Sequence, residues 1–242
     1  MRISLCLVFV FLAAASYSRE NADSTKAKLK AGVTFSLNSN GISSIPAFSL
    51  GDPAAMASVT LARGRFSYDP TLAYGLDGKP WFIDNWFHFK LVNRPSFELR
   101  TGVNISSFFT HYKLPEETVL KGERYFAFEL AGIYKFNPRT SLSLAYWSDN
   151  GQEKESLKGH FIDLILDKTD IPLGKQVLLA VNLQLFYIDY TDKNDGLFIA
   201  PRISAGLRRV PLSLFFQAIQ PITSNMTPSP EFQWNVGLAY TL

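Results

Sequence analysis

The last stretch of the chain, EFQWNVGLAYTL from Glu231 to Leu242, alternates between two chemistries at every residue. Large apolar side chains occupy every second position, and the positions between them are polar or small. Successive side chains of a β-strand point to opposite faces, so one face of this strand is apolar and the other tolerates water. The apolar set is Phe232, Trp234, Val236, Leu238, Tyr240 and Leu242, and the opposite set is Gln233, Asn235, Gly237, Ala239 and Thr241.

The same alternation repeats along most of the chain and predicts about twelve strands. Because soluble sandwiches also alternate, the number and spacing of the strands must decide between a sandwich and a membrane barrel. An even number places both chain ends of a bacterial barrel on the periplasmic side. The predicted strands are 29–37, 55–62, 65–75, 81–92, 97–109, 124–136, 141–147, 159–167, 176–188, 197–207, 210–219 and 231–242.

The connections between these strands fall into two alternating classes. Membrane barrels have short turns at the periplasmic end and longer loops outside. Apart from 76–79 and 168–174, the two classes separate by length in this order. The predicted outer connections are 38–53, 76–79, 110–122, 148–157, 189–196 and 220–230, and the inner ones are 63–64, 93–96, 137–140, 168–174 and 208–209.

The same register sorts aromatic side chains into two bands on the predicted lipid face. Amphipathic rings belong at both membrane interfaces, whereas a soluble sandwich has no reason to sort them in this way. The outer band is Tyr74, Trp81, Phe109, Tyr146, Tyr187 and Trp234, and the inner band is Phe66, Tyr68, Phe97, Tyr134 and Tyr240.

The first 18 residues have the features of a signal peptide. A positive charge at Arg2 precedes an apolar run from Leu5 to Leu12, which is too short to cross a bilayer. Small residues follow, and cleavage is expected after Ala15 or Ser18. Cys6 lies in this leader, so the mature chain should carry no thiol. We expect residues 19–28 to be a polar periplasmic lead-in and residues 29–242 to form the barrel.

With its leader, its alternating strands and a closing strand that carries Trp234 and Tyr240, the chain resembles the small outer-membrane β-barrel proteins of Gram-negative bacteria. It departs from them at Leu242, where that class often ends in Phe. The resemblance covers essentially the whole mature length. It implies an all-β, closed, antiparallel up-and-down transmembrane barrel of about 12 strands in the cell outer membrane.

The partners expected from this resemblance are outer-membrane lipid, lipopolysaccharide and, during insertion, the barrel-assembly machinery, and it leaves envelope protein partners open. The chain carries 24 basic and 21 acidic residues, a net charge of +3, without a basic cluster. This balance does not indicate a nucleic-acid partner.

The positions of the opposite parity should face the lumen, and they carry charges of both signs. Such a set lines a charge-patterned pore or cross-links the wall through salt bridges, and the sequence favours neither strongly. Bulky inward residues such as Trp86, Trp147 and Phe161 would narrow the lumen of a barrel of this size. The lumen-facing candidates are Asp84, His88, Lys90, Glu98, Arg100, Glu129, Asp163 and Arg202, with Asp69 beside them.

The first outer loop, NSNGISSIPAFSLGDP over residues 38–53, is long and unusually apolar. Exposing its apolar side chains to water is unfavourable, so the loop is predicted to fold back into the mouth as a constriction built on Ile45, Phe48 and Leu50. The alternative is that it packs on neighbouring loops above the barrel.

The histidines do not indicate an enzyme. The outer-membrane hydrolases of this architecture pair a histidine with a serine two residues on, and His88, His111 and His160 are followed at that position by Lys90, Lys113 and Ile162. Asp84 and His88 share a face but lie about 13 Å apart along a strand, which fits a wall network better than a catalytic pair.

The acidic run DYTDKNDG over residues 189–196 fits a solvated turn better than a calcium site. No catalytic residue, metal site or cofactor is predicted. The sequence therefore favours a narrow pore for small polar solutes, constricted by the first loop. A closed barrel that acts as a scaffold or accessory subunit of an envelope complex is the alternative, and an outer-membrane enzyme comes third.

Overall fold

A computed structural model describes residues 27–45, 48–113, 118–154, 156–190, 194–226 and 229–242. The predicted signal peptide and most of the predicted lead-in lie outside the described residues. In the described part of the chain, no helix is long and apolar enough to cross a membrane.

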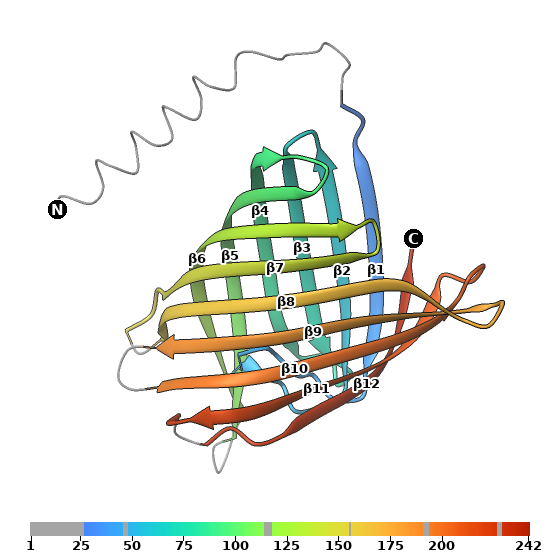
Figure 1. The fold of residues 1–242 in the computed structure, drawn as a ribbon. Helices are drawn as coiled ribbons and strands as arrows, with labels where there is room; N and C mark the ends of the chain where they lie inside the picture. Colours follow the sequence, from blue (N-terminus) through green and yellow to red (C-terminus); the bar gives the residue numbers. More distant parts are fainter. Residues whose placement is uncertain (1–26, 46–47, 114–117, 155, 191–193, 227–228) are drawn as a thin grey trace.

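The chain forms a closed barrel of twelve antiparallel strands in which each strand pairs with its neighbours in sequence and β1 pairs with β12 (Figure 1). Strands of opposite walls cross at a large angle in Figure 1, as the tilt of strands in a barrel requires. The prediction of a closed up-and-down barrel of about 12 strands is confirmed. The strands are β1 (Lys30–Asn38), β2 (Ala54–Arg63), β3 (Phe66–Gly75), β4 (Pro80–Asn93), β5 (Phe97–Lys113), β6 (Thr118–Asn137), β7 (Thr140–Gly151), β8 (Lys158–Leu173), β9 (Val177–Tyr190), β10 (Asn194–Leu207), β11 (Leu212–Ser224) and β12 (Gln233–Thr241).

The terminal strand closes the barrel with the predicted alternation. Trp234 and Leu238 are 51% and 44% exposed on the outer surface, whereas Asn235 is 2% exposed on the inner one. The ring of Phe215 on β11 and the carbonyl oxygen of Leu37 on β1 crowd the position that a Cβ of Gly237 would take. The closing seam therefore requires glycine at that position.

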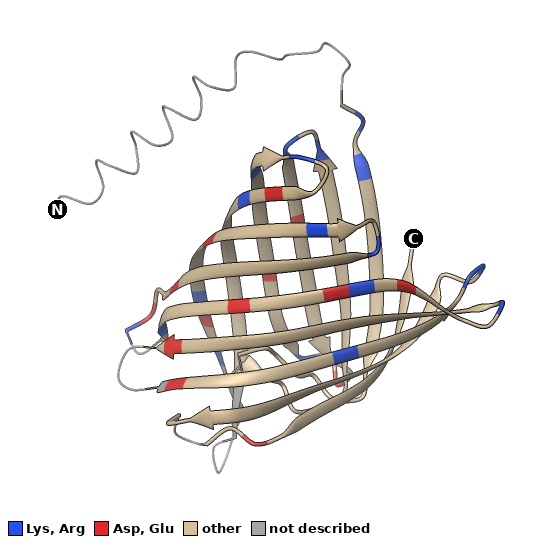
Figure 2. Ribbon diagram, in the orientation of Figure 1, with Lys and Arg blue, Asp and Glu red and all other residues tan. Residues whose placement is uncertain are grey.

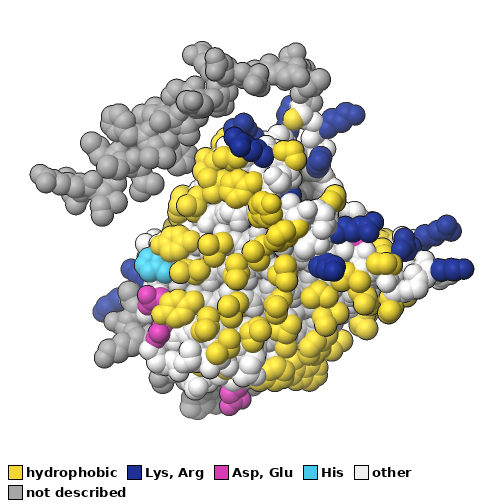
Figure 3. Space-filling view, viewed as in Figure 1, with side chains coloured by type: hydrophobic (Ala, Val, Ile, Leu, Met, Phe, Trp, Pro, Cys, Tyr) yellow, Lys and Arg dark blue, Asp and Glu magenta, His cyan; other side chains and the backbone are white. Residues whose placement is uncertain are grey.

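The outside of the barrel is a belt of exposed apolar side chains (Figure 3). Many of the Lys and Arg residues lie at the turns of one end, away from the belt (Figure 2). So many exposed apolar side chains are unfavourable in water and suit a lipid environment. We call the end with the turns at 64–65, 94–96, 138–139, 174–176 and 208–211 the inner end and the opposite one the outer end.

Three predicted connections are wrong. β9 runs to Tyr190 and β10 begins at Asn194, so every described residue of the predicted outer connection 189–196 is strand. β5 runs to Lys113 and β6 begins at Thr118, so most of the predicted outer loop 110–122 is strand. β8 continues to Leu173, so the predicted turn 168–174 is also mostly strand. The ladder of backbone hydrogen bonds between neighbouring strands does not need an apolar face, and it continues past the point where the hydrophobic alternation fades.

Trp81 was predicted in the outer aromatic band on the lipid face, and this prediction is wrong. Its side chain is 3% exposed and packs inside the barrel against Ala54 and Ala73. Tyr74 pairs with Pro80 and Ala73 pairs with Phe82, so Trp81 is the extra residue of a β-bulge. A bulge shifts the alternation by one position, which turns the indole inward.

Candidate functional site

The described residues of the first loop, 39–45 and 48–53, contact the inward side chains of β4, β5 and β6. The ring of Phe48 stacks on Phe108, with the ring centroids 4.1 Å apart, and meets Tyr125 edge-on at 5.0 Å. The indole Nε1 of Trp81 donates a 2.7 Å hydrogen bond to the Phe48 carbonyl oxygen. Phe48 is thereby 8% exposed, within the wall of the outer mouth.

Other apolar side chains of the same loop reach the opposite wall. Ile42 and Ile45 pack against a buried cluster on β8 to β11. Leu50 stays on the first wall, where it packs against Ala54 on β2 and Trp81 on β4. Strands β5 and β10 lie on opposite sides of the closed strand order, so the loop contacts both walls. The cluster beneath Ile42 and Ile45 is Phe161, Phe186, Ile188, Tyr190, Phe198, Ala200 and Ile219.

Aromatic side chains form a continuous row around this part of the lumen. Trp147 stacks on Phe161 with the ring centroids 4.5 Å apart, Phe161 on Phe186 at 5.2 Å, and Phe186 on Phe198 at 5.0 Å. Trp86 continues the row from β4, at 5.5 Å from Trp147. The row supplies the apolar layer on which the loop side chains rest.

Polar contacts tie the loop to β12. The side-chain oxygen of Asn235 accepts hydrogen bonds from the Ser39 hydroxyl at 3.3 Å and from the Asn40 backbone N–H at 3.1 Å. The Ser49 hydroxyl donates to the Gln233 side chain at 2.9 Å. The strand that closes the barrel therefore also anchors both arms of the loop.

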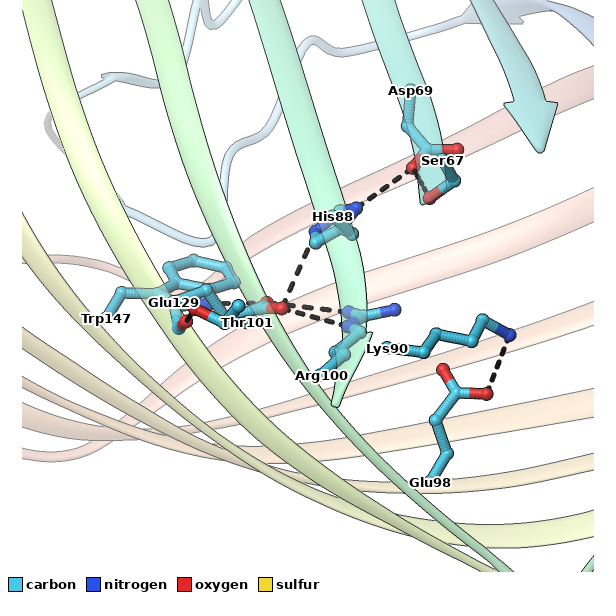
Figure 4. Close-up of polar contacts among 9 residues, drawn as sticks. All are labelled: Ser67, Asp69, His88, Lys90, Glu98, Arg100, Thr101, Glu129 and Trp147. Carbon is cyan, nitrogen blue, oxygen red and sulfur yellow. Dashed lines mark hydrogen bonds and ion pairs between the residues drawn. The ribbon is translucent and has the colours of Figure 1, made fainter. Parts of the chain in front are cut away.

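Below the loop, the wall from β3 to β7 carries a network of ion pairs centred on Glu129 (Figure 4). This carboxylate is 2% exposed. It accepts hydrogen bonds from Arg100 Nε at 2.9 Å and from Trp147 Nε1 at 2.8 Å. His88 lies between two acids, with Nδ1 3.0 Å from Asp69 Oδ2 and Nε2 3.5 Å from Glu129 Oε1. The network joins five consecutive strands through their side chains.

A glycine makes this network possible. Gly102 pairs with His88 on one side and with Glu129 on the other. A Cβ at Gly102 would lie 2.6 Å from His88 Cδ2 and 3.3 Å from Glu129 Cβ. The imidazole therefore reaches across the bare backbone of β5 toward the carboxylate on β6.

A second pair lies closer to the inner end. Lys90 Nζ donates to Glu98 Oε2 at 2.7 Å, and Lys135 Nζ approaches the same oxygen at 3.7 Å. The structure thus brings together five of the predicted lumen-facing candidates on one wall, namely His88, Lys90, Glu98, Arg100 and Glu129. Asp84 accepts a hydrogen bond from Asn104 instead of pairing with His88. This separation agrees with the distance expected along β4.

The remaining candidates, Asp163 and Arg202, lie on the wall formed by β8 to β11. Asp163 is 3% exposed, and its Oδ1 has no hydrogen-bond partner among the described residues. Arg202 lies over the ring of Phe215, with the guanidinium carbon 4.0 Å from the ring centroid. A cavity of about 240 Å³ opens beside it, lined by Asn182, Gln184, Ala200, Arg202 and Gln217.

The amide side chains of this cavity were not predicted as site residues, because the predicted set contained only charged and histidine side chains. Asn182 and Gln184 interrupt the apolar residues of β9 at the inward parity, and that interruption was the available signal. A larger pocket of about 570 Å³ lies at the outer mouth, lined by loop residues 48–50 and 52–53, turn residues 76, 77 and 79, Trp81 and residues 108–110 of β5.

Outside the wall, in the outer loop 152–157, the backbone N–H and guanidinium of Arg124 donate to Glu153 and lower the pKa of its carboxyl group. His160 Nδ1 lies 2.8 Å from the Tyr146 hydroxyl. The described part of the chain holds no group of three His, Cys, Asp or Glu residues that could bind a metal ion. The side chain of His111 lies outside the described residues.

No protein-family model and no curated protein sequence matches the chain. Among solved structures, the KdgM porin is similar over 86% of this chain and 98% of its own, with a TM-score of 0.54 and 10% sequence identity. The NanC porin is similar over 88% of this chain and all of its own, with a TM-score of 0.46 and 10% identity. The translocator domain of the autotransporter NalP from Neisseria meningitidis covers 98% of this chain at a TM-score of 0.46 and 9% identity.

The likeness to the KdgM porin shows that the two proteins share a fold. Together with the closed wall and the exposed apolar belt, it identifies this chain as a β-barrel of the outer-membrane type. Barrels of this type host several functions, so the function must be argued from the lumen and the loops.

Proposed function

We propose that this outer-membrane β-barrel is a narrow pore for small polar solutes and that the first loop constricts its outer mouth. The observation that carries the proposal is that Ile42 and Ile45 contact one wall of the outer mouth and Phe48 contacts the opposite wall. A loop that only covered the rim would leave these side chains against neighbouring loops.

Polar side chains that are partly exposed below the loop support the proposal of a polar pathway. The side chains of Lys90 and Arg100 are each 32% exposed and that of Asp69 is 27% exposed, although all three point inward. Their charges are balanced by neighbouring acids or bases, so the wall presents polar groups without a single dominant sign. The name of the KdgM porin agrees with this proposal, but the likeness itself concerns only the fold.

The second candidate function is a closed scaffold or accessory subunit. The network around Glu129 favours it, because ion pairs between neighbouring strands stiffen a wall whether or not anything crosses the barrel. We do not propose an enzyme, since His88 lies between two carboxylates of the wall and His160 contacts a tyrosine hydroxyl.

Current through the purified mature protein in a planar lipid bilayer separates these functions. The pore proposal predicts discrete current steps that are small and interrupted by closures, because the proposed constriction by the first loop would narrow the outer mouth. A folded protein that inserts into the bilayer but carries no current at any voltage, even with the loop deleted, would exclude the pore and leave the scaffold.

A further inference from the structure

Arg202 differs from the other bases that point into the middle of the barrel. Lys90 and Lys135 pair with Glu98, and Arg100 pairs with Glu129. Among the described residues, no carboxylate lies within ion-pair distance of Arg202, which stacks on the apolar ring of Phe215 instead. No ion pair with a described residue therefore neutralises its positive charge.

Arg202 lines the 240 Å³ cavity together with three amide side chains. It pairs across the sheet with Asn182 on β9 and with Gln217 on β11. Gln184 donates to the side-chain oxygen of Asn182 at 3.1 Å, and Asn182 donates to Asp167 at 2.7 Å. These bonds orient the two amides without using Arg202. Stacking covers one face of the guanidinium and leaves the N–H groups of its edge for a ligand.

We propose that this cavity is a binding site for a small monocarboxylate anion on its way through the lumen. The proposal deepens the proposed function and rests on it for the passage of the ligand. A planar guanidinium edge binds a carboxylate through two parallel hydrogen bonds. The amides of Gln184 and Gln217 lie within the same cavity and can bind a hydroxyl group next to the carboxylate.

The residues around the cavity favour a ligand that is small and carries a single negative charge. Asp163 and Asp167 face inward on β8, and Asp167 is joined to the cavity through Asn182. A second negative charge on the ligand would be repelled by these acids. The cavity volume is below the usual range for drug-sized ligands, which fits a molecule of a few carbon atoms.

Lactate is a suitable probe, because it carries one carboxylate and one adjacent hydroxyl. We expect saturable binding of lactate to the purified full mature barrel in detergent, measured by saturation-transfer NMR without any applied voltage. Arg202→Gln keeps most of the side-chain volume and should weaken binding at least tenfold. Arg202→Lys keeps the charge but loses the two parallel N–H donors of the guanidinium, so it should weaken lactate binding less than Arg202→Gln. Arg209→Gln removes an equal charge from an exposed inner turn and should change nothing.

Three results would overturn the inference: no saturable lactate binding to the folded wild type, unchanged affinity in Arg202→Gln, or tighter binding of hydrogen phosphate than of lactate. Retained heat-dependent gel mobility shows that each variant is folded. If the barrel conducts but does not bind lactate, the inferred binding site is wrong and the proposed pore stands. If the barrel binds lactate through Arg202 but carries no current, the inferred binding site stands and the proposed pore is wrong.

Discussion

Replacing Phe48 with aspartate (F48D) is expected to raise the single-channel conductance several-fold. The Phe48 ring fills the space between Phe108 and Tyr125, and losing a buried aromatic ring costs about 3–5 kcal/mol. An aspartate at that place would also be a buried charge without a partner, which is strongly unfavourable. The loop should leave the wall while the polar contacts to β12 keep its two arms attached.

Phe232→Asp is the matched control for this variant. Phe232 lies in the outer connection before β12, is 52% exposed and does not line the mouth pocket, so the same substitution there should leave the conductance unchanged. Accessibility of the loop to a protease reports whether F48D has displaced it. A displaced loop with the same conductance as the wild type would mean that the first loop is not the constriction.

Replacing Glu129 with alanine should lower the free energy of unfolding by about 3–5 kcal/mol, the usual cost of removing one partner from a buried ion pair. The change removes the acceptor of Arg100 and of Trp147 Nε1 and leaves His88 with only one acid. Urea-induced unfolding in lipid vesicles measures the loss. Glu129→Gln keeps an acceptor for the indole and should fall between the wild type and the alanine variant.

Glu123→Ala removes an acid of the same kind from the outer rim, where Glu123 Oε1 lies 3.1 Å from Lys121 Nζ. The Lys121 and Glu123 side chains are 39% and 13% exposed, so this pair is less buried than that of Arg100 with Glu129, and its loss should cost about 1 kcal/mol. If both alanine variants lost the same small amount, the network in Figure 4 would not hold the wall together.

The architecture was predictable because one rule, a side-chain period of two, acts along the whole chain. It located all twelve strands, whereas the orientation in the membrane, inferred from connection lengths, stays a prediction. The prediction failed for Trp81, where a bulge shifts the parity, and bulges have no reliable sequence signal here. It also failed between Thr110 and Gly122, where backbone pairing continues beyond the apolar belt.

The candidate site was less predictable, because its contacts depend on strand register and on residues far apart in sequence. Parity placed Arg100 and Glu129 in the lumen, but only the register shows that they meet diagonally across β5 and β6. The role of Gly102 was invisible, since a glycine next to a charged network looks like any other small inward residue. The amides beside Arg202 carry no charge and did not stand out.

The central claim is that the barrel wall separates lipid outside from water inside, and a four-residue scan on β9 tests it most directly. The one cysteine of the chain, Cys6, lies in the predicted leader, so single cysteines at positions 182 to 185 can carry spin labels without competing thiols. In lipid vesicles, spin labels that replace Leu183 and Leu185 should face lipid and be relaxed mainly by oxygen. Labels that replace Asn182 and Gln184 should face water and be relaxed mainly by a water-soluble nickel complex. If the nickel complex reached none of the four positions, the lumen would be dry and the account of a polar pore would be wrong.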